Sequence, residues 1–338
     1  MRVAVTGATG FTGGHVLRGL IDAGHQPRAL VRDADKLRRV EALHDLSSVD
    51  HVVGDVTDPA AVGALLEGCD AVIHAAAVAA LGPSAAELIE HTNLPATQLV
   101  LGRAAELGLD PIVHVSSQST LHPPPTGVYR ADDPLTANPV GAYGRSKVAC
   151  ERVARRLQDD GHPVVIVWPS GIVGPDDIGL SIAAGGTARL LRTNVVPFPK
   201  GGGILFNDVR DLAEVLVRCL EPGLGPRRFG VFGHFLDWGE MHELLVRVTG
   251  RNLKVLRLPD RVYDVLGALC EQVGRLGIEV PLDSATATFM TTLVPGNDEP
   301  TRSALGLDWR PADETYADLI RWLVAAGHLP AAKAPALA

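Results

Sequence analysis

The sequence contains few of the patterns that mark disulfide-rich, metal-binding or membrane-spanning proteins. Its four cysteines are widely separated and form no Cys-x-x-Cys pair, which argues against a disulfide framework or a cysteine zinc site. None of the twelve histidines has the ligand spacing His-x-x-x-His, so no metal is expected. His15, His74 and His114 fall in apolar segments, where structural, hydrogen-bonded histidines are expected. The apolar run over residues 71–81 is too short to span a bilayer and predicts a buried strand and its following loop.

Charge and composition exclude further classes of protein. A formal net charge of −8 and a pI of ≈ 5.8 argue against a nucleic-acid partner. Met1 is followed almost at once by a strand-like run, which leaves no room for a signal peptide, and the cysteines are expected to be free thiols in a reducing compartment. We therefore expect a cytoplasmic protein without membrane association.

A glycine-rich turn stands near the N-terminus, between an expected strand and an expected helix. The apolar residues 3–5 lead into the run TGATGFTGG, residues 6–14, after which apolar residues recur with helical spacing. Glycines at positions 7, 10 and 13 permit a tight turn and a close approach of backbone N–H groups to a pyrophosphate. The spacing Gly-x-x-Gly-x-x-Gly differs from the usual dinucleotide motif Gly-x-Gly-x-x-Gly, but the strand before it and the helix after it predict a dinucleotide-binding loop.

A tyrosine and a lysine are spaced for acid–base chemistry. Lys147 follows Tyr143 by four positions, in the run Tyr-Gly-Arg-Ser-Lys. On a helix, such residues lie on the same face about one turn apart. An ammonium favours the phenolate form of a nearby phenol, so proton donation and abstraction by the tyrosine become competent near neutral pH. Taken alone, the pair is suggestive only.

Short β-type runs alternate with helical patterns along the first half of the chain. Strands are expected near residues 2–6, 27–32, 49–53, 70–75, 111–116 and 163–168. This alternation predicts an α/β fold with a Rossmann-like, doubly wound parallel sheet. At 338 residues and 46% hydrophobic, the chain is long enough for one large α/β unit and a smaller lobe. The final residues, 331–338, look like a frayed tail.

Together these features resemble the extended short-chain dehydrogenase/reductase family, a superfamily of NAD-dependent epimerases, dehydratases and reductases. The resemblance extends along nearly the whole chain, and the order of the motifs is more specific than any one of them. The matching segments are the glycine loop, Gly54-Asp55-Val56, His74-Ala75-Ala76-Ala77, Asn93 with Thr97, Val115-Ser116-Ser117, Tyr143 with Lys147, and Pro169-Ser170 before Gly174-Pro175.

The resemblance implies two structural units. The NAD(P)-binding Rossmann domain would comprise residues 1–175 and about 206–234, where residues 207–213 begin an amphipathic helix that returns to the sheet. A smaller, discontinuous substrate-binding lobe would comprise about 176–205 and 235–330, with residues 303–309 closing it before a last helix. The resemblance also allows a homodimer.

The resemblance further implies the residues of the site. The catalytic ones are Ser117, Tyr143 and Lys147; Ser116, Ser119 and Thr120 are close enough that the register of the serine could differ. Asn93 has two interpretations, a family site residue or a helix-start residue. The implied cofactor-binding residues are Gly7, Thr9, Gly10, Phe11, Thr12, Gly13, Arg32, Asp55, Val56, Ala75, Ala76, Ala77, Asn93, Tyr143, Lys147, Pro169, Ser170 and Ile172.

The tip of the second strand indicates which cofactor is bound. An acidic side chain there accepts hydrogen bonds from a free ribose hydroxyl, whereas a guanidinium binds a 2′-phosphate. Arg32 occupies the tip, so NADP(H) is favoured and NAD(H) remains an alternative. Arg32 could instead be a solvated surface residue, and Asp33 could turn inward in its place.

We therefore expect an NADP(H)-dependent oxidoreductase that acts on the carbonyl or alcohol of a small, mainly apolar substrate, as relatives resembling dihydroflavonol reductases and 3β-hydroxysteroid dehydrogenases do. The alternatives are a nucleotide-sugar epimerase or dehydratase with tightly bound NAD, and a dinucleotide-binding redox sensor without catalysis. Residues 121–140 and 178–206 should contact the substrate. Trp168 stands where relatives often have Arg, which could alter the floor of the pocket.

Overall fold

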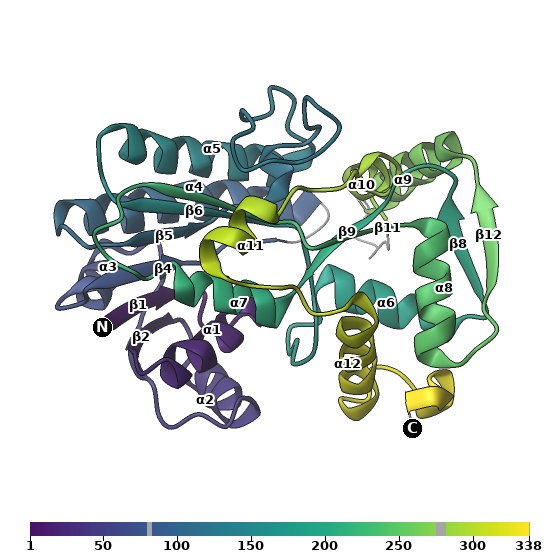
Figure 1. Ribbon diagram of the computed structural model, residues 1–338, viewed down its shortest axis with the longest axis horizontal. Coiled ribbons are helices and arrows are strands. Elements are labelled where there is room, and N and C mark those ends of the chain that lie inside the picture. Colours follow the sequence, from purple (N-terminus) through teal and green to yellow (C-terminus); the bar gives the residue numbers. More distant parts are fainter. Residues whose placement is uncertain (80–82, 275–281, 338) are drawn as a thin grey trace.

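A seven-stranded parallel sheet forms the centre of the molecule, in the order β10-β6-β5-β4-β1-β2-β3 (Figure 1). The computed structural model describes residues 1–79, 83–274 and 282–337. The strands are β1 Arg2–Thr6, β2 Gln26–Val31, β3 Asp50–Val53, β4 Ala71–His74, β5 Ile112–Val115, β6 Val164–Pro169 and β10 Arg227–Val231. The predicted doubly wound sheet is confirmed, and β10 adds a seventh strand to the six that the sequence located.

Helices cover both faces of this sheet because successive strand residues point to opposite sides. On one face, Val3 and Val5 of β1 pack with α1, α2 and α7, whereas Ala4 packs with α3, α4 and α5 on the other face. In Figure 1, α4 and α5 lie above the sheet, and α1 and α2 lie below it. The helices are α1 Phe11–Asp22, α2 Ala34–Leu43, α3 Pro59–Leu66, α4 Pro83–Glu106, α5 Gly141–Asp159 and α7 Val209–Arg218.

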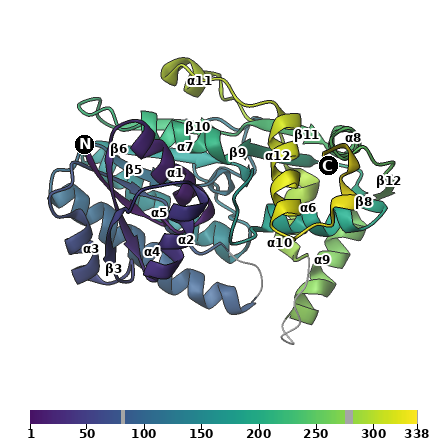
Figure 2. The same ribbon diagram turned by 90° about the horizontal axis from the view of Figure 1, so that it is seen from below.

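A second body of structure follows β6 and is built from two smaller sheets and a layer of helices. One sheet has the order β11-β9-β7 and the other pairs β12 with β8. Their strands are β7 Gly171–Val173, β8 Val195–Pro199, β9 Gly203–Asp208, β11 His234–Asp237 and β12 Lys254–Leu258. Its helices are α6 Ile182–Arg192, α8 Trp238–Thr249, α9 Asp260–Gly274, α10 Ser284–Thr292 and α12 Ala312–Ala325, whereas α11 Glu299–Leu305 packs on β10 of the central sheet. Figure 2 shows α9 and α10 projecting together at one end of the molecule.

The C-terminal segment is ordered against this second body. Residues 331–333 and 335–337 form two short 3-10 helices, and Ala334 is only 1% exposed. Ala336 lies beside Gly250, at the end of α8. The expectation of a frayed tail is therefore wrong for residues 331–337, because small apolar side chains there complete the packing of α8 and α12. Among the described helices, none is both long and apolar enough to cross a membrane.

Candidate active site

The glycine turn joins β1 to α1, and two of its glycines are required by the space around them. Gly7 has a φ of +76°, and a Cβ at this position would lie 2.8 Å from the backbone nitrogen of Ala76. A Cβ on Gly13 would collide with the carbonyl oxygen of Gly7. The turn is closed by a hydrogen bond from the Gly10 nitrogen to the Gly7 carbonyl, 2.9 Å long. At Gly7 and Gly13, the turn therefore has room for backbone only.

The N-terminus of α1 has the features of a phosphate-binding site. Gly10 is its N-cap and provides no side-chain hydrogen bond, and the first turn contains no acidic residue. The first N–H groups of the helix therefore keep their donors, and the helix dipole favours an anion there. Thr9, Phe11 and Thr12 are half-buried around the turn. These residues fit the pyrophosphate of a dinucleotide.

The loop after β4 is held next to the glycine turn by a buried histidine. Thr6 Oγ1 lies 2.8 Å from Nδ1 of His74 and accepts a hydrogen bond of 3.2 Å from the Ala76 nitrogen. Nε2 of His74 lies 3.2 Å from the hydroxyl of Thr97 on α4. Burial lowers the pKa of His74 to about 3, so the ring is neutral. His74 is thus structural, and it holds the loop of Ala75, Ala76 and Ala77 against Gly7.

Asn93 connects this same loop to the helix of the candidate catalytic tyrosine. Its side chain accepts a hydrogen bond from the Val78 nitrogen (2.7 Å) and donates to the Val78 carbonyl (3.1 Å) and to Ser146 Oγ (3.1 Å). Ser146 in turn donates to the carbonyl of Tyr143. Asn93 lies well inside α4, so its interpretation as a helix-start residue is wrong.

Tyr143 and Lys147 lie in the first two turns of α5. Lys147 is buried, and its ammonium donates a 2.8 Å hydrogen bond to the carbonyl of Val115, the last residue of β5. Tyr143 is half-buried, and its hydroxyl makes no hydrogen bond with another described residue. The lysine therefore fixes α5 against the end of β5, and the phenol remains available to a ligand.

Ser117 follows β5 and caps the short 3-10 helix η1, Gln118–Thr120. Its hydroxyl oxygen accepts hydrogen bonds from the Ser119 nitrogen (3.2 Å) and the Ser119 hydroxyl (3.0 Å). The Ser117 hydroxyl itself donates one long hydrogen bond, 3.4 Å, to the side-chain oxygen of Gln118. Of the four hydroxyl residues in this segment, Ser116 and Thr120 donate to a buried carboxylate. This arrangement leaves the Ser117 proton the least engaged of the four.

That carboxylate belongs to Glu151, a residue that the sequence analysis did not single out. Glu151 is 0% exposed and accepts 2.6 Å hydrogen bonds from Ser116 and Thr120, on either side of Ser117. It also accepts a 2.7 Å bond from the indole of Trp168 and pairs with Arg155 at 2.7 Å. The spacing could have predicted it, because Glu151 follows Lys147 by one helical turn and therefore lies on the same face of the helix.

Trp168 is therefore part of the layer behind the serine. Its side chain is completely buried, and its indole nitrogen donates to Thr120 (3.1 Å) as well as to Glu151. The guanidinium of Arg155 lies 5.7 Å from the centre of the Trp168 ring. A cation from α5 thus neutralises Glu151, and the tryptophan on β6 supplies a neutral donor.

The polar side chains at the tips of β2 and β3 differ in whether they form hydrogen bonds within the protein. Arg32 is exposed, and among the described residues none forms a hydrogen bond or ion pair with it. Asp33 is the N-cap of α2 and accepts from the nitrogens of Asp35 (2.8 Å) and Lys36 (3.2 Å). Hydrogen bonds from Thr57 lower the pKa of Asp55, which follows β3. Val56 packs at the edge of the core beside it.

The segment after β6 contacts the second body of structure. The Ser170 hydroxyl donates a 2.7 Å hydrogen bond to the carbonyl of Phe232 and lies 3.2 Å from the Asn207 side chain. Pro169 ends β6, and Ile172, in β7, is half-buried. The Ser170 hydroxyl thus has structural partners, Pro169 is buried, and Ile172 alone of these three keeps a partly exposed apolar side chain.

Helix α10 borders the site from the C-terminal part of the chain. The ring of Phe289 lies 5.0 Å from that of His122, and Thr292 forms a 3.1 Å hydrogen bond with His122. Ala285 lies close to Gly141, where α5 begins. The loop over residues 121–140 and α10 therefore lie together near the start of the helix that carries Tyr143.

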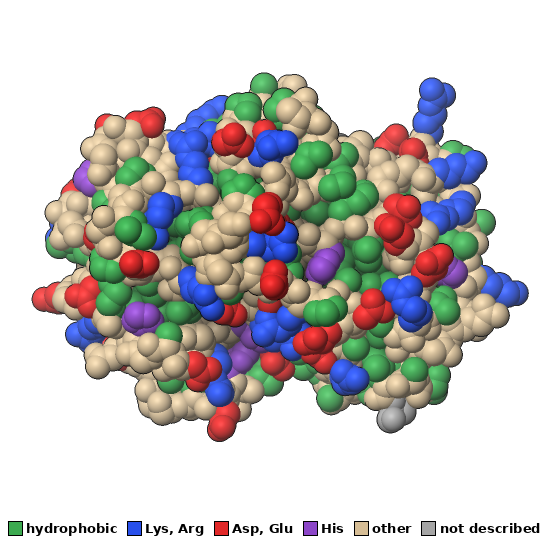
Figure 3. Space-filling view, viewed as in Figure 1, with side chains coloured by type: hydrophobic (Ala, Val, Ile, Leu, Met, Phe, Trp, Pro, Cys, Tyr) green, Lys and Arg blue, Asp and Glu red, His purple; other side chains and the backbone are tan. Residues whose placement is uncertain are grey.

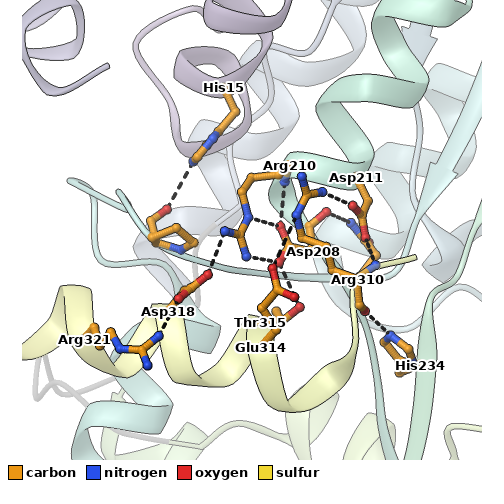
Figure 4. Close-up of polar contacts among 12 residues, drawn as sticks. His15, Asp208, Arg210, Asp211, His234, Arg310, Glu314, Thr315, Asp318 and Arg321 are labelled. Atoms are coloured by element: carbon orange, nitrogen blue, oxygen red, sulfur yellow. Dashed lines mark hydrogen bonds and ion pairs between the residues drawn. The ribbon is translucent and has the colours of Figure 1, made fainter. Parts of the chain in front are cut away.

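The cations of the second body are exposed or already paired. Arg189, Arg192 and Lys200 are all exposed. Arg210 forms 2.7 Å ion pairs with Asp208 and Asp318, which join α7 to α12 (Figure 4). On the face drawn in Figure 3, acidic and basic side chains are interspersed. Among the described cations, these four offer little to a diphosphate.

Comparison with known proteins identifies the family. The model of the NAD dependent epimerase/dehydratase family matches residues 3–231. A putative dihydroflavonol 4-reductase from Synechocystis sp. is 32% identical over 212 residues, 62% of this chain and 60% of that protein, so the match spans about three fifths of each. The 4-hydroxy-2-methyl-3-oxo-4-farnesyl-3,4-dihydroquinoline-1-oxide ketoreductase from Stigmatella aurantiaca is 26% identical over 97% of this chain and 98% of its own length.

A solved structure shares the fold over nearly the whole chain. The dTDP-glucose 4,6-dehydratase from Streptomyces venezuelae, crystallised with NAD, superposes with a TM-score of 0.74 at 21% identity and covers 98% of this chain and 99% of that one. Because the family model matches more than half of the sequence, this chain belongs to the NAD-dependent epimerase/dehydratase family of extended short-chain dehydrogenases/reductases and is an NAD(P)-dependent enzyme.

Proposed function

We propose that this enzyme transfers a hydride between NADP(H) and the carbonyl or alcohol carbon of a small, mainly apolar substrate, with Tyr143, Lys147 and Ser117 as its catalytic residues. The observation that carries the proposal is the 2.8 Å hydrogen bond from Lys147 to Val115. It holds the helix of Tyr143 next to the strand end that leads into Ser117. The Tyr143 hydroxyl forms no hydrogen bond with another described residue, and the Ser117 hydroxyl donates only one long hydrogen bond, of 3.4 Å.

Each of the three residues has a separate role at the substrate oxygen. When bound, the nicotinamide supplies the hydride to the substrate carbon or accepts it. In reduction, Tyr143 donates its proton to the oxygen as negative charge develops there. Lys147 uses one of its three N–H donors on Val115, and its charge stabilises the tyrosinate that remains. Ser117 donates a hydrogen bond to the same oxygen and so stabilises the developing charge.

The preference for NADP(H) rests on Arg32 and Asp33 together. Arg32 is an exposed guanidinium that forms no hydrogen bond or ion pair with another described residue, although its charge acts on the carboxylate of Asp55. Asp33 uses its carboxylate to cap α2, so it is not free to turn toward a ribose. A 2′-phosphate would therefore meet a cation at this edge of the site, and charge-assisted bonds of this kind contribute about 1.5–3 kcal/mol each.

Arg32→Ala tests the cofactor preference directly. We expect NADPH affinity, measured by fluorescence titration, to fall by about tenfold while NADH affinity stays constant, since only NADPH carries the 2′-phosphate. Arg38→Ala is the matched control, because Arg38 is an exposed arginine on α2 that pairs with Asp35. Tighter binding of NADH by the wild type, or an unchanged NADPH preference in Arg32→Ala, would contradict the proposal.

The apolar substrate class is supported by what surrounds the site. We place the substrate between the unit formed by residues 1–175 and 206–234 and the lobe formed by 176–205 and 235–330. A nucleotide sugar needs paired cations or N–H donors for its diphosphate. Arg189, Arg192 and Lys200 of this lobe are exposed, and Arg210 of the neighbouring helix α7 is paired. Phe289 and Ile172, in contrast, are partly exposed apolar side chains. Two relatives named for reduction of dihydroflavonols and of a farnesyl quinoline fit the same class.

A substrate panel separates this proposal from the second candidate, a nucleotide-sugar epimerase or dehydratase, which the family description favours. NADPH oxidation and thermal stabilisation are measured with aromatic, steroidal and aliphatic ketones beside UDP-, GDP- and dTDP-sugars. We expect turnover with apolar ketones and net consumption of NADPH. Turnover of a nucleotide sugar alone, with copurified NAD and no net use of added cofactor, would replace the proposal with the second candidate. Binding of the dinucleotide without any turnover would indicate a redox sensor.

A further inference from the structure

Three side chains with metal-binding groups converge beside the start of α1, where the ring of His15 lies 5.8 Å from that of Phe11. They are His15 on α1, His44 at the C-cap of α2, and Asp176 in the loop after β7. One possible ligand atom from each lies within 4.8 Å of the other two. Because the residues come from three elements, their sequence spacing resembles no metal motif.

These side chains have few partners within the protein. His15 and His44 are only 8% and 9% exposed, and their rings meet edge to face with centroids 4.6 Å apart. Within residues 1–79, 83–274 and 282–337, the ring nitrogens of His44 and the carboxylate of Asp176 form no hydrogen bond or ion pair. Both ring nitrogens of His44 therefore remain available to a ligand, beside a second imidazole and a carboxylate.

The single polar contact of His15 matches a metal-bound histidine. Its Nε2 lies 3.1 Å from the carbonyl oxygen of Pro175, toward which the ring points in Figure 4. Nε2 must donate in this contact, which leaves Nδ1 with a free lone pair. Histidines that bind metals commonly give their other N–H to a backbone carbonyl in this way.

The charges around the cluster are compatible with a cation. Arg210, which lies near His15 and Asp176, is compensated by its ion pairs with Asp208 and Asp318. Arg18, near His44, is paired with Asp22.

We propose that His15, His44 and Asp176 form a binding site for a divalent transition metal, with Zn²⁺ as the best match. Two imidazoles and one carboxylate are ligands that Zn²⁺ accepts, with water at the fourth position of a tetrahedron. Zinc–ligand bonds of about 2.0–2.2 Å require ligand atoms closer together than 4.8 Å, so binding would draw the three side chains inward. The metal would then link α1, the helix of the glycine turn, to the loop after β7.

The test uses the full chain, freed of metal with a chelator. Co²⁺ is titrated first, because tetrahedral Co²⁺ gives visible absorption bands far stronger than those of the hydrated ion, and Zn²⁺ is then added as competitor. We expect saturable binding of one Co²⁺ per chain, displaced by Zn²⁺, and a higher melting temperature with Zn²⁺.

Three variants assign the site. His44→Gln and Asp176→Asn should each lower Zn²⁺ affinity at least about tenfold, and asparagine tolerates the positive φ of residue 176, which is 67°. His91→Ala removes an exposed histidine of α4 and should leave affinity unchanged. Circular dichroism of each metal-free variant checks that it is folded. Equal Zn²⁺ affinity in the wild type, His44→Gln and Asp176→Asn, or no saturable binding by the wild type, would overturn the proposal.

Discussion

Around the glycine turn, the contacts are made by the backbone of one strand–turn–helix unit and of the neighbouring strand end, whereas around α10 they are made by side chains of segments far apart in the chain. Gly7, Gly10 and Gly13 contact one another and the loop after β4. His122 instead meets Phe289 and Thr292 from α10. The cofactor side therefore depends on backbone geometry that a short motif encodes. The substrate side depends on side chains that only the packing of the second body brings together.

The largest expected effect is that of Tyr143→Phe. This variant separates catalysis from cofactor binding on the cofactor side of the site. The ring stays for packing and only the proton-bearing oxygen is lost. We expect turnover to fall by about 10²–10⁴-fold, the usual contribution of a positioned acid or base, while NADPH affinity stays close to wild type. The measurement is NADPH oxidation with the best ketone of the panel. Near-normal turnover would remove Tyr143 from the mechanism.

Gly13→Ala tests whether the backbone of the turn, and no nearby side chain, sets the cofactor affinity. The new Cβ would collide with the Gly7 carbonyl and lie 2.7 Å from the Cα of Ala8. We expect NADPH affinity to fall at least about tenfold and the free energy of unfolding to fall by about 1–3 kcal/mol.

Gly102→Ala is the control for this variant, because a Cβ there meets nothing within 4 Å on helix α4. It should be neutral, or stabilising by up to about 1 kcal/mol, with unchanged NADPH affinity. If both alanine variants bind NADPH as the wild type does, the turn is not the pyrophosphate site.

Glu151→Gln tests the buried network behind Ser117, which belongs to neither of the two compared regions. The change leaves Arg155 without its charge partner, and breaking such a buried pair costs about 3–5 kcal/mol of stability. Turnover should also fall, since Ser116 and Thr120 lose the carboxylate that fixes the serine turn.

Glu214→Gln is the matched control, because Glu214 pairs with Arg218 one helical turn away at a surface where both side chains are more than 40% exposed. Its cost should not exceed about 0.5 kcal/mol. Chemical denaturation measures both variants. Similar costs for the two would mean that the Glu151 network is not a buried, structure-determining pair.

Phe289→Ala should have the smallest effect and acts only on the substrate side. Loss of the ring removes apolar contact area, worth about 1–2 kcal/mol, so KM for an apolar ketone should rise by roughly 5–30-fold. NADPH affinity should not change. Leu224→Ala, at an exposed loop leucine between α7 and β10, serves as control. A rise in the Kd for NADPH that equals the rise in KM would show that α10 acts on both sides of the site.

The regions of this molecule differ, for a physical reason, in how much of their structure can be predicted from the sequence. Six strands of the central sheet were located because buried parallel strands are short continuous apolar runs bounded by turn residues. β10 was missed because its sequence, Arg-Arg-Phe-Gly-Val, begins with two charged residues and contains a glycine. This segment becomes a strand because it pairs with β6 in the sheet, and its local β-propensity does not predict that.

By itself, the sequence determined the glycine turn, the Tyr143–Lys147 spacing and the parallel sheet, because each follows from the backbone period of one segment. The tertiary structure alone decided that Glu151 lies behind Ser117, that residues 331–337 pack on α8, and that Asp33 caps α2 and leaves Arg32 free. It also decided that His15 meets His44 and Asp176. Such contacts depend on where separate elements meet, and the spacing of residues within one element carries no information about that.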